Sequence, residues 1–256
     1  MNDEFYIGWE DKAAPDIGKT VRKAVIVVLA LALIAPIALA LAQHMIGTSV
    51  FEWGTLKSFS GIFRAAPYPH LLVPRPGTAG KETQFSTYYL VAPWKFGLDA
   101  NAIASFDGKP VTLKGTLIYR GNQTMVETKP EWIAVSTNDA RRARSDAPHQ
   151  SLGKQTLTGE IVDSKCFLGV MNPGQLAPHR ACAIRCISGG VPPVLLVRQK
   201  DGPAIYLLLV SAEGKPVNQQ VLNLVAEPVE ITGEVERQGD LLILRADPAS
   251  YRRVSR

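Results

Sequence analysis

Residues 109–117 (KPVTLKGTL) and residues 227–235 (EPVEITGEV) share one pattern of proline, alternating residues and glycine. Pro110 and Pro228 are 118 residues apart, and the same offset places residues 88–91 (YYLV) over residues 206–209 (YLLL). Agreement of two segments at one offset indicates an internal repeat. We therefore expect the chain to contain two copies of one structural unit.

Each copy predicts the same order of strands. Two strands bounded by glycine and proline come first, then a strand containing tyrosine and leucine, and finally a β-hairpin. The hairpins are expected to turn at Arg120-Gly121-Asn122 and at Gln238-Gly239-Asp240. Five short strands, with a helical or coil segment before the hairpin, are typical of a small, partly open barrel of the oligonucleotide/oligosaccharide-binding (OB) type. The sequence therefore predicts a mainly β protein with two tandem OB-like small β-barrels, residues 50–135 and 154–256, joined by a linker at 136–153.

The two copies differ between their first and second strands. Gly61 and Pro69 are eight residues apart, whereas Gly159 and Pro193 are thirty-four apart, so the second copy contains a 26-residue insertion, assigned to residues 164–190. OB-like barrels often use this loop to bind ligands. The insertion holds every cysteine of the chain and one histidine, in the pattern C-x12-H-x2-C-x3-C: Cys166, His179, Cys182 and Cys186. This coincidence makes the insertion the candidate functional site.

A short helix is expected within the insertion. Residues 178–186 (PHRACAIRC) begin with proline and are followed by Gly189-Gly190, which are start and stop signals for about two helical turns. The histidine and the last two cysteines would then share one helical face at positions i, i+3 and i+7. The remaining donors would come from outside this helix: Cys166, Asp163 and Met171. Three thiolates and an imidazole suit zinc or copper(I) and, less well, an iron–sulfur cluster, and the spacing does not choose among them.

Two other interpretations of the cysteines stay open. Cys166 could form a disulfide with Cys182 or Cys186 that only staples the insertion, since an extracytoplasmic compartment is oxidising. An odd number of cysteines leaves one thiol over, which also allows a thiol-redox role. A disulfide staple makes no use of an imidazole, so His179 favours the metal interpretation.

Residues 159–193 resemble a recurring element of uncharacterised bacterial membrane-anchored envelope proteins with an OB-like domain. The element has a Gly-Glu-Val/Ile-Val-Asp strand, a cysteine, a His-x-x-Cys-Ala-x-x-Cys helix and a Gly-Gly-x-Pro turn, and all four parts occur here. The resemblance extends loosely over residues 206–208 and 229–234. It implies an envelope location and brings no assigned activity.

The N-terminal region predicts a membrane anchor. Nineteen residues without a charge, 24–42, would extend about 28 Å as a helix, which matches the core of a bilayer. Basic residues crowd its amino side, so the positive-inside rule places the N-terminus in the cytoplasm. The prediction is a cytoplasmic segment at 1–23, a transmembrane helix at 24–46 and periplasmic barrels on a single-pass protein of the bacterial inner membrane. A signal peptide cleaved at a small-x-small site within residues 38–42 is the alternative.

Composition and motifs exclude several classes of function. The formal net charge of +5 lies in small clusters rather than one stripe, which argues against nucleic acid as a partner. Signatures of hydrolases and kinases are not evident, so catalysis is not expected. The first hypothesis is a membrane-anchored accessory protein with a Cys/His metal or redox site, associated with a respiratory or cofactor-assembly complex, for example as an electron-transfer accessory. The alternative is a non-catalytic interaction subunit in which the cysteines form a structural disulfide.

Overall fold

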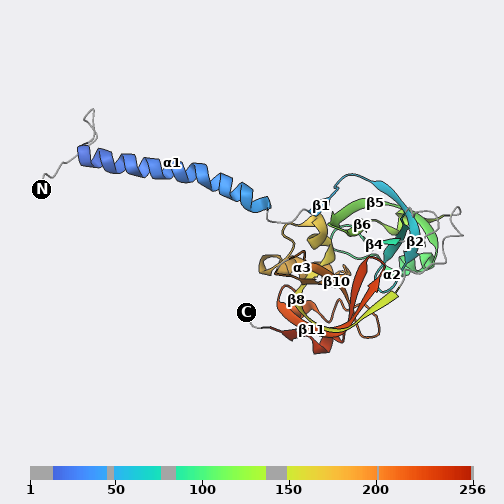
Figure 1. Cartoon of the computed structure of the whole chain (residues 1–256). Coiled ribbons are helices and arrows are strands. Elements are labelled where there is room, and N and C mark those ends of the chain that lie inside the picture. The colour runs from blue at the N-terminus through green and yellow to red at the C-terminus, as the bar shows by residue number, and fades with distance from the viewer. Residues whose placement is uncertain (1–13, 45–48, 76–84, 137–148, 201, 255–256) are drawn as a thin grey trace. The chain divides into compact units, whose positions relative to one another are not determined.

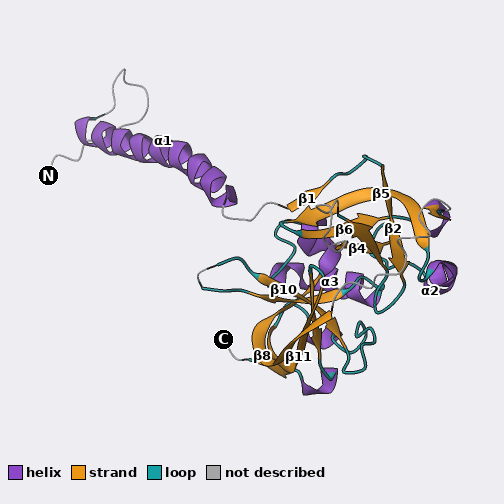
Figure 2. Cartoon of the chain, turned by 45° about the vertical axis from the view of Figure 1, so that its right-hand side comes forward, coloured by secondary structure: helices purple, strands orange, loops and turns teal. Residues whose placement is uncertain are grey.

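The computed structural model describes residues 14–44, 49–75, 85–136, 149–200 and 202–254. The chain consists of two compact units, Met1–Gly47 and Thr48–Arg256. Within the described residues, the first unit is a single helix and the second is built mainly of strands (Figures 1 and 2).

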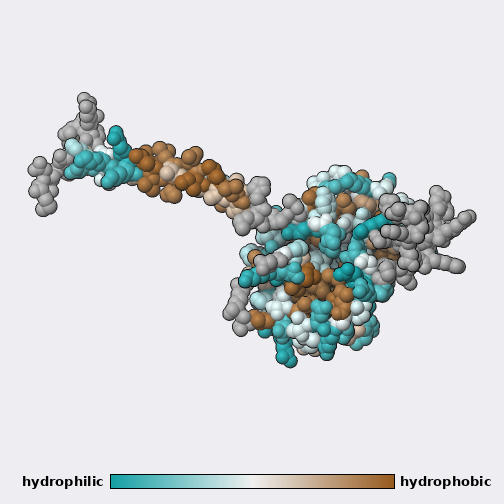
Figure 3. All heavy atoms as spheres, in the orientation of Figure 1, coloured by the Kyte–Doolittle hydropathy of each residue, from teal (hydrophilic) through white to brown (hydrophobic). Residues whose placement is uncertain are grey.

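Helix α1 (Pro15–His44) is long and apolar enough to cross a membrane between Pro15 and Ala42. Figure 3 shows apolar residues along most of this helix and polar residues at its amino end. Its large apolar side chains are exposed, Leu29 by 64% and Leu39 by 66%, which calls for an apolar environment such as lipid. The helix begins nine residues before the predicted residue 24, since Pro15 and Asp16 suit a first helical turn. Residues 1–13 and 45–48 lie outside the described residues.

The first barrel closes through five strands. In spatial order β5 is followed by β2, β3, β4 and β6, and β6 pairs with β5 again; β4 and β6 are parallel and the other neighbours antiparallel. The short strands β1 and β7 add to β5. Its elements are β1 (Ser49–Phe51), β2 (Lys57–Arg64), β3 (His70–Pro74), β4 (Phe85–Val91), α2 (Ala100–Ile103), η1 (Ala104–Phe106), β5 (Pro110–Arg120), β6 (Gln123–Glu127), η2 (Pro130–Trp132) and β7 (Ile133–Val135).

The second barrel repeats this order. Strand β11 is followed by β8, β9, β10 and β12, which returns to β11, and the parallel pair is β10 with β12. Strand β13 adds to β11. Its elements are β8 (His149–Asp163), η3 (Cys166–Val170), η4 (Ala177–His179), α3 (Arg180–Ser188), β9 (Pro193–Val197), β10 (Ile205–Val210), η5 (Leu222–Leu224), β11 (Pro228–Gln238), β12 (Leu241–Arg245), η6 (Pro248–Ser250) and β13 (Arg252–Arg253). The prediction of two tandem OB-like barrels is confirmed.

The sequence repeat has a physical cause at the glycine of each long strand. A Cβ atom on Gly115 would lie 2.3 Å from Val126 Cγ1, and one on Gly233 would lie 2.3 Å from the carbonyl oxygen of Arg245. Each glycine therefore permits the close approach that closes its barrel. The predicted linker 136–153 falls largely on residues 137–148, which lie outside the described residues, and strand β8 already begins at His149.

Each barrel has its own apolar core, and a further core lies between the barrels. Phe63 and Leu113 are fully buried in the first barrel, and Ile231 and Leu244 in the second. The core between the barrels combines side chains of both: Tyr68, Tyr89, Ile118 and Met125 from the first, and Cys166, Phe167, Cys186 and Tyr206 from the second. Two of the cysteines are therefore buried where the barrels meet.

Candidate metal centre

The insertion leaves the second barrel at Asp163 and returns at Pro193. It forms one π-helical turn, η3, a 3-10 turn, η4, and helix α3. The predicted helix is confirmed: Pro178 lies in the turn that opens it, and the N–H of Gly189 donates to the carbonyl oxygen of Arg185 at its end.

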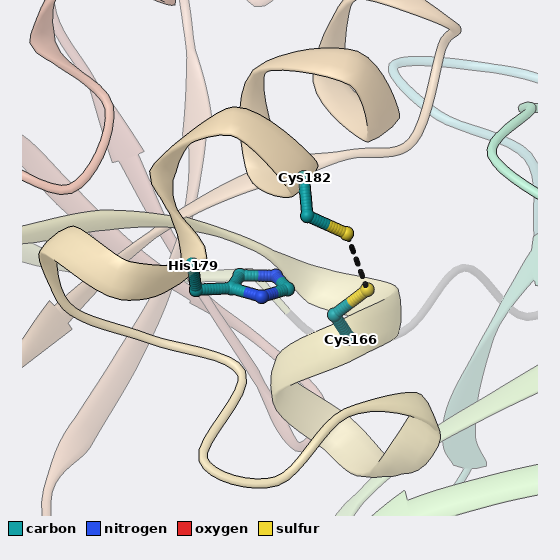
Figure 4. Close-up of side chains that lie close together, drawn as sticks. All are labelled: Cys166, His179 and Cys182. Atoms are coloured by element: carbon teal, nitrogen blue, oxygen red, sulfur yellow. Dashed lines mark hydrogen bonds between the residues drawn. The ribbon is translucent and has the colours of Figure 1, made fainter.

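Three of the four residues predicted to bind a metal, Cys166, His179 and Cys182, form one cluster, and Cys186 joins Cys166 in a second cluster with Asp163. The Sγ of Cys166 lies 3.9 Å from the Sγ of Cys182 and 3.9 Å from the Sγ of Cys186. Ligand atoms of Cys166, His179 and Cys182 all lie within 4.8 Å of one another (Figure 4). The turn that carries Cys166 and the helix that carries Cys182 thus face each other. Met171, the further soft donor, is 46% exposed.

Asp163 connects the two sides of this cluster. Its carboxylate accepts a hydrogen bond from the backbone N–H of Cys166 at 2.8 Å and one from Nε2 of His179 at 2.9 Å. Asp163 is fully buried and His179 is 6% exposed. One Asp163 oxygen also lies within 4.8 Å of the sulfurs of Cys166 and Cys186. The carboxylate therefore fixes the imidazole and the Cys166 turn relative to each other, as carboxylates do behind metal-binding histidines.

Lys95 is a member of the site that the sequence analysis missed. Its Nζ lies 2.7 Å from the Sγ of Cys182 and 3.9 Å from the Sγ of Cys186. It comes from the first barrel, in the loop after β4, 87 residues before Cys182. Such a distant partner leaves no signal in the spacing of the cysteines.

The loop that carries Lys95 is held at both ends. The buried ammonium of Lys165 donates to the carbonyl oxygens of Ala92, at 2.8 Å, and Trp94, at 2.6 Å. The N–H of Gly97 donates to the carbonyl oxygen of Gly189 at 2.9 Å. Trp94 has a φ of 62°, an unfavourable value for a residue with a side chain, which these bonds maintain.

Burial and hydrogen bonding make the three thiols differ in exposure and in pKa. Cys166 and Cys186 are 2% and 1% exposed, whereas Cys182 is partly exposed. The bond that Cys166 donates to Cys186, together with burial and the Asp163 carboxylate, raises the pKa of Cys166. Accepting that bond lowers the pKa of Cys186. The hydrogen bond to Cys182 raises the pKa of Lys95, which stays an ammonium.

The sulfur separations match those of metal ligands. Two sulfurs that bind one tetrahedral metal ion at about 2.3 Å lie about 3.8 Å apart, close to the separations around Cys166. Bonded sulfurs of a disulfide lie about 2.0 Å apart, and the three cysteines are free thiols here. Softness of the sulfurs suits copper(I) and zinc.

Comparison with protein-family models gave no match for this chain, and a search of curated proteins gave no relative. The resemblance of residues 159–193 to envelope proteins therefore stays a prediction.

Proposed function

We propose that this protein is a membrane-anchored accessory protein that binds one soft metal ion, copper(I) or zinc, through Cys166, His179, Cys182 and Cys186. The main support is the pair of 3.9 Å sulfur separations beside a buried imidazole. A disulfide staple needs only the sulfurs, whereas a metal site also uses the imidazole that the Asp163 carboxylate orients beside them.

The proposed ligands and Asp163 would have different roles in binding the ion. Because Nε2 of His179 donates to Asp163, Nδ1 would be the nitrogen left to hold an ion, and the carboxylate would make the imidazole a more basic ligand. The buried Cys166 and Cys186 would keep water away from a bound ion, and the partly exposed Cys182 would give a route for its exchange. Bound copper would supply one-electron chemistry, whereas zinc would supply a structural or Lewis-acid centre.

Helix α1 supports the anchoring, and the surrounding sequence supports the orientation. Lys19, Arg22 and Lys23 precede its apolar part, which favours a cytoplasmic N-terminus and barrels in the periplasm. A metal centre tethered there would serve a respiratory or cofactor-assembly complex in the same membrane.

The orientation predicts the behaviour of reporters fused to the full chain in a bacterial host. A phosphatase that works only after export is expected to be active at the C-terminus, and a fluorescent protein that matures only in the cytoplasm is expected to stay dark there. The same reporters at the N-terminus should show the reverse and serve as the control. Fluorescence at the C-terminus with an inactive phosphatase would reject this orientation.

Metal content tests the proposed function. Full-length protein purified from membranes in detergent is expected to carry one copper or zinc ion per chain by elemental mass spectrometry. His179→Ala leaves the Asp163 carboxylate without the imidazole and should lower stability, but it should keep its circular dichroism spectrum while losing the ion, because the second barrel has its own core. His149→Ala, on the exposed start of β8, is the matched control and should keep the ion.

The opposite outcome would support the interaction subunit. Purified protein without metal, in which peptide mapping finds Cys166 bonded to Cys182 or Cys186, would show that the cysteines staple the insertion.

A further inference from the structure

The cysteine cluster has a cationic neighbour, Lys95, which is not one of the four proposed ligands. The ammonium of Lys95 contacts Cys182 at 2.7 Å and lies 3.9 Å from Cys186. Hydrogen bonds on both sides of the loop fix its backbone, and the partly exposed side chain of Lys95 extends from it to the sulfurs. Its effect on a bound ion is electrostatic.

The charge of the metal decides how large that effect is. With three thiolates and a neutral imidazole, zinc(II) gives the centre a formal charge of minus one, and copper(I) gives it minus two. A buried negative charge is costly unless a cation compensates it. The Asp163 carboxylate lies in the same cluster and adds to the negative charge.

A single ammonium therefore discriminates between the two ions. Coulomb attraction is proportional to charge, so Lys95 stabilises the copper(I) centre more strongly than the zinc centre, which has one unit less of negative charge. Sulfur softness alone does not separate these ions, because both accept thiolates.

We infer that Lys95 is a specificity-determining residue that shifts the affinity of the cysteine cluster toward copper(I) and away from zinc(II). This inference rests on the proposed function and deepens it. It also explains why the cluster lies at the contact between the barrels: the second barrel supplies the sulfurs, and the first supplies the compensating charge.

The test compares two affinities in the same variants. Full-length apoprotein in detergent, kept reduced and free of oxygen, is titrated with copper(I) against a chromophoric copper(I) chelator and with zinc(II) against a zinc chelator. In Lys95→Met, which removes the charge and keeps the length, copper(I) affinity is expected to fall roughly tenfold more than zinc affinity. Lys95→Arg keeps the charge and should retain most of the preference. Lys114→Met, at an exposed position on β5 of the same barrel, should change neither affinity.

The outcomes separate this inference from the proposed function. Equal losses of both affinities in Lys95→Met, or a larger loss for zinc, overturn the inference alone. Wild-type protein that binds neither ion overturns the proposed function and the inference with it. Circular dichroism of Lys95→Met checks its fold, and Lys95→Gln provides a second neutral variant if that protein does not fold.

Discussion

Replacement of Asp163 by alanine is expected to lower the free energy of unfolding by roughly 3–5 kcal/mol. Asp163 is fully buried, and its two oxygens accept hydrogen bonds from the Cys166 N–H and from Nε2 of His179. Alanine leaves both donors without their partner in a place that water does not reach, and unpaired buried groups cost their full desolvation energy. Urea denaturation of the full-length protein in detergent, followed by tryptophan fluorescence, measures the loss.

Asp99 gives a matched control for this change. Its side chain is exposed and accepts a hydrogen bond from the N–H of Ala102 at the start of α2. Loss of such a cap costs about 1 kcal/mol, so Asp99→Ala should remain close to wild type. If Asp163→Ala loses no more than Asp99→Ala, the carboxylate does not hold the insertion together.

A second substitution at Asp163 separates the effect on stability from the effect on metal binding. Asp163→Asn keeps an oxygen that can accept the Cys166 N–H but removes the negative charge behind the imidazole. Loss of such a partner typically lowers metal affinity roughly tenfold to a hundredfold. Asp163→Asn is therefore expected to be more stable than Asp163→Ala and still to bind metal more weakly than wild type.

The parts of this fold that sequence predicts are those that local patterns determine. Gly115 and Gly233 recur because a side chain at either position would collide with the neighbouring strand. The turns at Gly121 and Gly239 recur because their φ values of 57° and 61° favour glycine. Steric needs of this kind repeat with the barrel, which makes the repeat visible without any structure.

The insertion also has one part that local sequence predicts and one part that it does not. Helix α3 follows from a proline and two glycines close in sequence, so the shared face of His179, Cys182 and Cys186 was predictable. The sequence predicts Asp163 only as a direct metal ligand. In the structure its carboxylate lies near the sulfurs of Cys166 and Cys186, and its hydrogen bonds also orient His179 and the Cys166 turn.

Two lysines escaped prediction because their partners are distant in the chain. Lys95 meets Cys182 across 87 residues, and Lys165 meets Ala92 across 73. A lysine in sequence indicates an exposed cation, and only tertiary contacts reverse that expectation. The start of helix α1 also differs from the prediction. The uncharged stretch indicates only the part that can contact lipid, whereas the helix begins earlier and includes Lys19, Arg22 and Lys23, which are good helix formers.

Replacement of Lys165 by methionine is expected to cost roughly 3–5 kcal/mol, a loss as large as that of Asp163→Ala. Lys165 is 1% exposed, its Nζ pairs with Glu127 at 2.5 Å, and it donates to the carbonyl oxygens of Ala92 and Trp94. Methionine fills the volume but leaves a carboxylate and two carbonyls without their donor. Since the loop of Lys95 loses its anchor, copper(I) affinity should fall too. Urea denaturation and chelator competition on one preparation measure both effects.

A double-mutant cycle shows whether the orphaned carboxylate causes the loss. Glu127 is largely buried, with a side chain 14% exposed, so Lys165→Met leaves a nearly desolvated negative charge. Glu127→Gln removes that charge, and the double variant should be more stable than the sum of the single losses predicts, by roughly 0.5–3 kcal/mol. The pair Lys57–Glu52, whose side chains are 45% and 22% exposed, provides the control, because its partly hydrated charges should make each single replacement cost less than Lys165→Met. Additive losses at Lys165 and Glu127 would mean that this ion pair contributes no coupling energy, and the loss in Lys165→Met would then come from the unpaired carbonyl oxygens of Ala92 and Trp94.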